Sequence, residues 1–175
     1  MYRGRARIGL GEVKGGVAEV LEWAALFQQT AFRVTEGSTT SLISEALHLA
    51  GRSEEALQAS REGQRRAEKG LVGHLMPEIH RIRGNILRDL GRADDSDAAY
   101  GRAVVCAHGQ GALSLELRAL TSLLELRLSR GRPGDLAAKL RRAMSAMACA
   151  ADRPDLAAAD ALLSRIRDGA RLTKA

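Results

Sequence analysis

Three short stretches, spaced forty residues apart, limit the folds open to this 175-residue chain. Each contains Gly-Arg, at Gly51, Gly91 and Gly131, followed by acidic residues and then Ala or Leu. A helix-compatible stretch lies on both sides of each glycine. Glycine adopts the left-handed conformation that ends a helix, whereas a phosphate loop follows a strand, and none is expected here. The recurrence therefore predicts three units of helix, tight turn and helix.

Composition agrees with an all-helical fold. The chain is 45% hydrophobic but only 3% aromatic, and three prolines interrupt it. Ala and Leu dominate the apolar residues, and both favour helices, whereas strands favour β-branched and aromatic residues. The length suits a single domain with a sizeable core. We therefore expect an all-α chain organised as one domain over residues 1–175.

The residues after each glycine suit the start of a second helix. They are Ser53 in the first unit, Asp94 and Asp95 in the second, and Pro133 with Asp135 in the third. Serine can cap exposed amides, acids oppose the helix dipole, and proline is tolerated in the first turn. We expect these residues to provide the N-terminal chemistry of the second helices.

A weaker copy lies upstream and a single helix lies downstream. Gly15 precedes Gly51 by 36 residues, so we take it as the turn of the first unit, which begins with a poor, glycine-rich helix. The units then span about 2–35, 38–70, 75–110 and 113–150. A closing helix is expected over 153–168, with apolar residues at helical spacing at Leu156, Ala159, Leu162, Leu163 and Ile166.

Helix pairs at this period are typical of α-solenoids, and the residues resemble tetratricopeptide repeats (TPR). The unit around Gly91 resembles them most, with Gly84 as the small residue in mid helix. Tyr100 stands at the aromatic position and Ala103 at the following small one, while Ser96 replaces the usual alanine. In the other units the corresponding positions hold Ala56, Ser60 and Gly63, and Leu136, Leu140 and Ala143. The resemblance implies a right-handed α-solenoid of TPR-like helix pairs.

A narrower resemblance concerns the C-terminal part. The segments "ELRALTSLLELRLSRGRPGDLAAKL" and "DRPDLAAADALLSRI" look like the C-terminal TPR region of bacterial STAND-type ATPase and adenylate-cyclase-like regulators. The phosphate-binding motif G-x-x-x-x-G-K-[ST] of the ATPase part does not occur in this sequence. The resemblance therefore implies a sensor or scaffold module of a bacterial regulatory system, without a catalytic role.

The sequence carries no pattern that indicates an enzyme. The four histidines form no H-x-x-x-H pair, no cysteine stands at zinc-ligand spacing, and G-x-S-x-G is absent. Cys106 and Cys149 lie in Ala-rich helical stretches, which favours small apolar packing over a reactive thiol. We expect no catalysis, no cofactor and no metal. With no membrane-spanning run and no signal peptide, we expect a cytoplasmic protein.

The net positive charge of the chain leaves nucleic-acid binding open as a second class of function. The net charge is +6 and the isoelectric point about 10.0, which invites a nucleic-acid hypothesis. Acidic residues accompany the arginines in nearly every segment, however, and no uninterrupted basic block occurs. Aromatic residues for base stacking are also scarce. We therefore expect a protein or peptide partner, possibly acidic. The alternatives are nucleic-acid binding through the scattered arginines and a structural fragment that homodimerises.

In TPR arrays the first helices of successive pairs line the concave face. Counting back ten, six and three residues from each turn glycine selects the inward positions. Arg81, Asn85 and Arg88 then share one helix face, which Arg118 of the next first helix could join. Such arginines would suit the carboxylates of a peptide, although pairing with Glu78 and Asp89 is the competing interpretation. The remaining inward positions are Ser41, Glu45 and His48, then Thr121, Glu125 and Leu128, and finally Arg5, Gly9 and Glu12.

The N-terminal unit suggests a further partner. Trp23, Leu26 and Phe27 lie on a helix whose own partner helix is glycine-rich, so apolar surface is expected to stay open there. The ends of a repeat array need polar faces. We therefore expect residues 1–35 to support a homodimer or to dock a partner domain.

Overall fold

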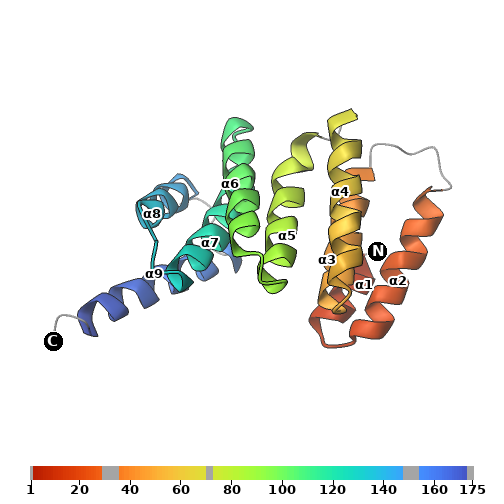
Figure 1. Cartoon of the computed structure of the whole chain (residues 1–175), viewed down its shortest axis with the longest axis horizontal. Coiled ribbons are helices and arrows are strands. Elements are labelled where there is room, and N and C mark those ends of the chain that lie inside the picture. The colour runs from red at the N-terminus through yellow and green to blue at the C-terminus, as the bar shows by residue number, and fades with distance from the viewer. Residues whose placement is uncertain (1, 29–35, 70–72, 148–153, 173–175) are drawn as a thin grey trace.

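A computed structural model describes residues 2–28, 36–69, 73–147 and 154–172. Within these ranges the chain is helical and contains no strand (Figure 1). The prediction of an all-α chain is confirmed for this part. The helices are α1 (Tyr2–Gly9), α2 (Val13–Gln28), α3 (Glu36–Leu49), α4 (Ser53–Lys69), the 3-10 turn η2 (Gly73–Leu75), α5 (Met76–Asp89), α6 (Ala93–Gly109), α7 (Leu113–Ser129), α8 (Leu136–Ala146) and α9 (Pro154–Leu172).

The recurring glycines end helices, as predicted. Gly51, Gly91 and Gly131 have φ values of +75°, +73° and +67°, in the left-handed region that favours glycine. Each amide donates to the carbonyl three residues earlier, and the next amide donates to the carbonyl five residues before it. This pattern satisfies carbonyls that a helix end leaves without partners. The predicted turns at these three glycines are therefore confirmed.

The first unit has a different turn glycine from the one predicted. Gly15 lies inside α2, whereas Gly11, forty residues before Gly51, has a φ of +90°. Its amide donates to the carbonyl of Ile8 at 3.0 Å, and the amide of Glu12 donates to that of Arg7 at 2.9 Å. The same two bonds occur at Gly51. The prediction for Gly15 is wrong, and a forty-residue spacing relates all four turns.

Small residues let the two helices of a pair approach closely. A β-carbon on Gly84 would overlap the ring of Tyr100, which is fully buried on α6, so Gly84 faces its partner helix as predicted. The hydroxyl of Ser96 donates to the Gly84 carbonyl at 2.8 Å. Eighty residues earlier, Gly4 and Gly16 approach in the same way, and a β-carbon on Gly4 would lie 2.7 Å from the Gly16 carbonyl oxygen.

The acids after the turns at Gly51 and Gly91 lie in the first turn of the next helix, where they were expected to oppose the helix dipole. Neither α6 nor α8 has a side-chain hydrogen bond at its N-terminal cap. Instead, Arg52 donates two hydrogen bonds to Glu55, at 2.7 and 2.6 Å, and Arg92 donates two to Asp95, at 2.9 and 2.6 Å. At Gly51 and Gly91, the Gly-Arg with a following acid thus combines a glycine turn with an ion pair across the first turn of the next helix, whereas in the third copy Asp135 pairs with Lys139.

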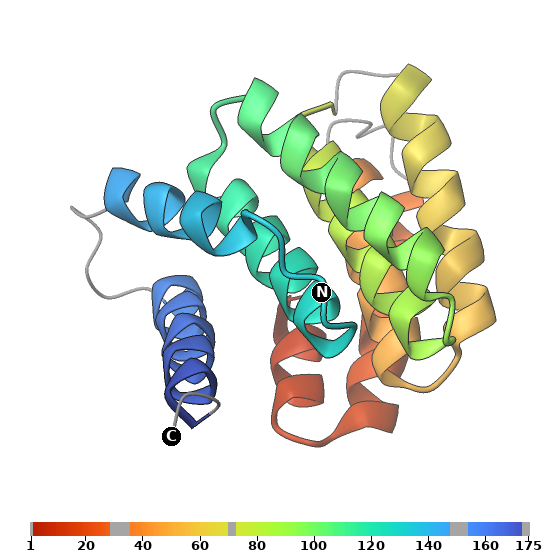
Figure 2. The same cartoon turned by 60° about the vertical axis from the view of Figure 1, so that its left-hand side comes forward.

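Each helix packs against its sequence neighbours, and the first helices of the pairs also pack against one another. Contacts join α1 to α3, α3 to α5, α5 to α7 and α7 to α9 (Figure 2). Buried apolar residues fill the space between the layers, and Leu120, Leu124 and Leu140 belong to a cluster that extends into α9. Ala159, Leu162 and Leu163 bury the inner face of α9, which confirms the predicted apolar face of the closing helix.

The N-terminal pair exposes apolar side chains on α2. Trp23 and Leu26 keep 43% and 48% of their surface open to solvent, and the side chain of Phe27 lies outside the described residues. Cys149 also lies outside them. In the part of the chain that the structure describes, no helix is long and apolar enough to cross a membrane.

Candidate functional site

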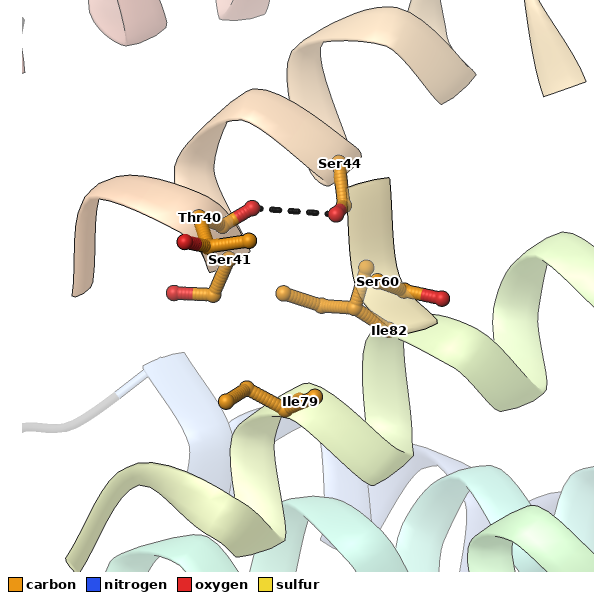
Figure 3. Close-up of a pocket in the computed structure, with 6 residues that line it drawn as sticks. All are labelled: Thr40, Ser41, Ser44, Ser60, Ile79 and Ile82. Carbon is orange, nitrogen blue, oxygen red and sulfur yellow. Dashed lines mark hydrogen bonds between the residues drawn. The ribbon is translucent and has the colours of Figure 1, made fainter. Parts of the chain in front are cut away.

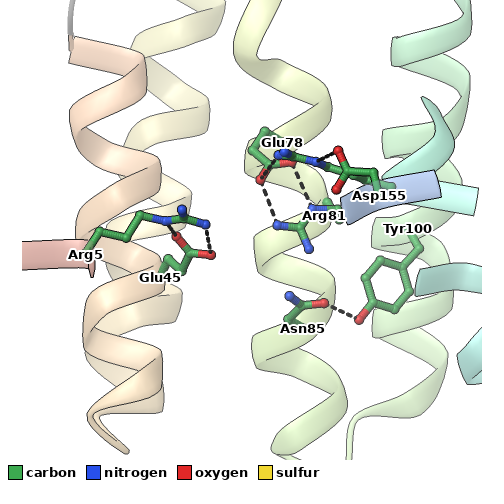
Figure 4. A network of polar contacts seen from close by, with 8 residues as sticks. Arg5, Glu45, Glu78, Arg81, Asn85, Tyr100 and Asp155 are labelled. Atoms are coloured by element: carbon green, nitrogen blue, oxygen red, sulfur yellow. Dashed lines mark hydrogen bonds and ion pairs between the residues drawn. The ribbon is translucent and has the colours of Figure 1, made fainter. Parts of the chain in front are cut away.

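Five helices surround a hollow lined by charged side chains, with a volume of about 340 Å³. We call it the charged hollow. Residues of α1, α3, α5, α7 and α9 form its wall, which is the same set of helices that pack as a layer. Figure 4 shows the polar contacts on this wall. The lining residues are Arg5, Glu45, Arg81, Arg118, Thr121, Ser122, Asp155 and Ala158.

Arg81 is the least exposed arginine of this wall, and Glu78 holds it in place. The two side chains lie one turn apart on α5 and form two parallel hydrogen bonds, at 2.9 and 2.7 Å. Only 15% of Arg81 and 16% of Glu78 is exposed. Burial acts to raise the pKa of Glu78, but the hydrogen bonds and charge of Arg81, with smaller help from Arg118 and Arg5, leave that pKa below its ordinary value. The pair is therefore ionised at neutral pH.

Arg118 joins the closing helix to the rest of the hollow. Its Nε donates to Asp155 of α9 at 2.9 Å, and its Nη1 lies 3.6 Å from the Glu78 carboxylate. The side chain is 41% exposed. Arg118 thus makes one direct hydrogen bond to a carboxylate and a longer ion pair to a second, and its side chain stays partly open to solvent.

Arg5 and Glu45 form the other charged pair of the hollow. Arg5 of α1 donates to Glu45 of α3 at 2.7 and 3.2 Å. The hydrogen bond and the charge of Glu45 raise the pKa of Arg5 above its ordinary value. The hollow and its rim thus hold three arginines and, counting the neighbouring Glu78, three carboxylates, so their formal charges cancel.

Asn85 is half-buried one turn from Arg81 on α5 and does not line the hollow. The hydroxyl of Tyr100 donates to the side-chain oxygen of Asn85 at 2.6 Å (Figure 4). Burial raises the pKa of that tyrosine, so it remains a donor at neutral pH. Asn85 therefore uses its acceptor to hold the aromatic ring that packs on Gly84.

Of the seven residues predicted to bind a peptide, the structure brings Glu45, Arg81 and Arg118 together in the hollow. The other four do not line it. His48 contacts Asp89 at 3.0 Å, and Arg88 donates to the same carboxylate at 2.9 Å. Glu125 lies 3.8 Å from Arg165 of α9. The contacts of His48 and Glu125 join neighbouring helices, whereas Arg88 pairs with Asp89 within α5. The pairing of Arg81 with Glu78 and of Arg88 with Asp89 agrees with the competing interpretation of these arginines.

One contributor to the site, Asp155, was not recognised in the sequence, and another, Arg5, was predicted to point inward but with the wrong register. Asp155 belongs to α9, which stands outside the forty-residue repeat, so no spacing related it to Arg118. Arg5 was placed ten residues before its turn. With Gly11 as the turn, Arg5 instead stands at the position of Glu45, Asn85 and Glu125. Aligning the chain on a constant period of forty would have found this equivalence.

A second charged hollow, of about 370 Å³, lies where α6 begins and α7 ends. Arg127 donates two hydrogen bonds to Asp97, at 2.7 and 2.8 Å, and Arg130 donates to Asp94 at 2.7 Å. Arg132 completes the wall. These pairs connect consecutive helix pairs at the edge where the glycine turns lie.

A small crevice between α3, α4 and α5 is lined by hydroxyl groups and two isoleucines (Figure 3). Ser44 donates to the carbonyl of Thr40 at 2.9 Å, and Ser60 donates to that of Leu57 at 2.8 Å. A β-carbon on Gly63 would lie 2.6 Å from Thr40, so α3 and α4 are already in tight contact beside it. The crevice is therefore a small, partly polar region where these three helices pack together.

Within the described ranges, His, Cys, Asp and Glu side chains form no group of three or more that could hold a metal ion. The sequence matches no protein-family model, and no curated protein matches it either. The chemistry of the charged hollow therefore has to be inferred from the side chains that line it. It offers guanidinium donors and carboxylate acceptors at fixed positions.

Proposed function

We propose that this protein is a non-catalytic scaffold or sensor module that binds a protein or peptide in the charged hollow. The observation that carries the proposal is the set of arginines that protein carboxylates hold in the wall of five helices. A guanidinium whose orientation is already fixed loses little conformational freedom when it binds a ligand. Such a wall suits an extended segment that presents carboxylates and backbone groups.

Within the hollow, Arg118 is the residue that we assign to the partner. It is more exposed than Arg81 and makes a single short hydrogen bond to Asp155, whereas Arg81 is held by two hydrogen bonds to Glu78. A carboxylate of the partner would bind the open edge of Arg118 or replace Asp155 there. Arg81 then acts indirectly: it holds the Glu78 carboxylate in place, and that carboxylate lies beside Arg118.

The balance of charge favours a protein partner over a nucleic acid. The hollow and its rim carry as many carboxylates as arginines, and a phosphate backbone would meet Glu45, Glu78 and Asp155 as well as the guanidinium groups. A peptide carries both donors and acceptors and can satisfy both signs. An acidic side chain or a free C-terminal carboxylate suits the arginines best.

We further propose that the chain is a right-handed solenoid of TPR-like helix pairs, from a cytoplasmic regulatory system of bacteria. Two observations support the repeat part: the forty-residue spacing of four turns, and the contacts of the first helices with one another. Neighbouring first helices in contact form one layer, as the inner wall of a solenoid would. The apolar side chains of α2 support association of two copies through residues 1–35.

An array of peptides tests the binding proposal. Peptides with acidic residues near a free C-terminus are compared with the same peptides ending in an amide, using wild type, Arg118→Gln and Arg132→Gln. Wild type and Arg132→Gln should select the same free-carboxylate peptides, and Arg118→Gln should weaken their binding about tenfold. Identical selection by all three proteins, or no preference for carboxylates, would refute this function.

A further inference from the structure

Three arginines on adjacent helices lie outside the charged hollow. They are Arg61 of α4, Arg83 of α5 and Arg102 of α6, and we call them the arginine cluster. Both α4 and α6 pack against α5 (Figure 2). Arg83 reaches across to α4, where it donates a hydrogen bond to Gln64, one helical turn from Arg61. Burial lowers the pKa of Arg83 most, and the charges of Arg102, Arg61 and Arg92 lower it further, against the opposing effect of Asp95.

Carboxylates do not neutralise this cluster. Within the part of the chain that the structure describes, none of the three arginines forms an ion pair. The nearby carboxylates contact other side chains. Glu62 binds two arginines of its own helix, Asp95 binds the arginine at the start of α6, and Glu68 accepts a hydrogen bond from Gln64. Glu68 keeps its charge, because Gln64 is neutral, but the three arginines outnumber this carboxylate, and the cluster keeps an excess of positive charge.

The base of the cluster contains polar atoms without hydrogen bonds. Arg83 donates from Nη1 to Gln64 at 3.0 Å, but its buried Nε has no acceptor among the described residues. Beside it, His80 is only 6% exposed, and its Nδ1 also lacks a partner there. Burial, followed by the charges of Arg102 and Arg83, lowers the pKa of His80 against the weaker opposing effect of Glu68. His80 is therefore neutral at physiological pH.

We propose that the arginine cluster binds a dianionic phosphate group. Like charges held together without a counterion repel, and a bound anion relieves this repulsion. Planar guanidinium donors match the oxygens of a phosphate, and a dianion neutralises more of the three charges than a single carboxylate would. Arg61 and Arg102 are exposed and can reach such a group from solvent, while Arg83 fixes its position from the helix between them. This site is separate from the charged hollow and does not depend on the function proposed there.

The histidine rings provide a direct test by NMR. Inorganic phosphate replaces chloride at constant ionic strength and at about pH 8, where the phosphate is dianionic. We expect a saturable shift of the His80 ring signals and none at His48, which contacts Asp89 elsewhere. Arg102→Gln should weaken the apparent affinity about tenfold, because one charge-assisted contact is lost. Arg132→Gln, which changes an exposed arginine outside the cluster, should leave the affinity unchanged.

Two further probes make the test specific for a dianion. Sulfate stays dianionic at lower pH, so at saturation it should raise the pH at which His80 titrates. Dimethyl phosphate, which has the single charge of a nucleic-acid backbone unit, should bind at least tenfold more weakly than inorganic phosphate. An unresponsive His80, the same affinity in Arg102→Gln as in wild type, or equal binding of dimethyl phosphate would overturn the proposal.

Discussion

The ring of Tyr100 on α6 lies directly against the Cα of Gly84 on α5, with no space for a β-carbon between them. Gly84→Ala should therefore destabilise the protein by about 1–3 kcal/mol, and Gly84→Leu should cost more, because the ring has to move in a filled core. Urea unfolding measures both. Gly101→Ala is the matched control, since nothing lies within 4 Å of a β-carbon there and α6 gains helix propensity. A Gly84→Ala variant as stable as Gly101→Ala would contradict this packing.

The first turn can be located by two glycine substitutions. Gly11 has a φ of +90°, so Gly11→Ala should lose about 1–2 kcal/mol through backbone strain. Gly15 is helical, and a β-carbon on it would meet only the end of the flexible Arg7 side chain, so Gly15→Ala should be neutral or stabilising. Thermal unfolding compares the two variants. The opposite order would restore Gly15 as the turn and remove the constant spacing of forty.

The Glu78–Arg81 pair should make stability depend on pH. Because the pKa of Glu78 is lower in the folded protein, its contribution is complete above the ordinary pKa of a glutamate, near 4.5, and is lost as the pH falls through the lowered value. At pH 7, Glu78→Gln should cost about 2 kcal/mol, since the mostly buried Arg81 loses its carboxylate. The difference from wild type should shrink in acid.

Urea unfolding at a series of pH values measures this difference. Glu55→Gln provides the control, because that carboxylate pairs with Arg52 in an exposed i,i+3 pair, and exposed pairs contribute little. Its unfolding curve should stay close to wild type at every pH. A cost of Glu78→Gln that remains constant into acid would show that the ionised pair is not its source.

Association of two copies through α2 can be measured by light scattering. Trp23 and Leu26 expose much of their apolar surface, and open surface of this kind is commonly covered by a partner. We expect a dimer at high protein concentration and a monomer for Leu26→Glu, whose helix should be unchanged by circular dichroism. Val105→Glu is the control, because Val105 is also exposed but lies on α6. A wild-type monomer at all concentrations would rule out the homodimer.

The helices and most of their turns could be predicted from the sequence because these features depend on local interactions. Gly51, Gly91 and Gly131 end helices through bonds that reach no further than five residues. Gly84 could also be identified, since a glycine in mid helix needs a packing reason. The first turn was different, since several glycines compete there, and the left-handed φ of Gly11 with its two backbone hydrogen bonds identifies it as the turn.

The candidate site depended on tertiary structure. Arg81 and Glu78 are near in sequence, and their pairing was foreseen, but Arg118 meets Asp155 across 37 residues and through a helix outside the repeat. The sequence established which residue types the first helices carry. Which arginines bind carboxylates, and which remain without them around Arg83, depends on how α4, α5, α6 and α9 pack. Ion pairs form wherever the folded backbone brings opposite charges within a few ångströms, and this distance is unrelated to separation along the chain.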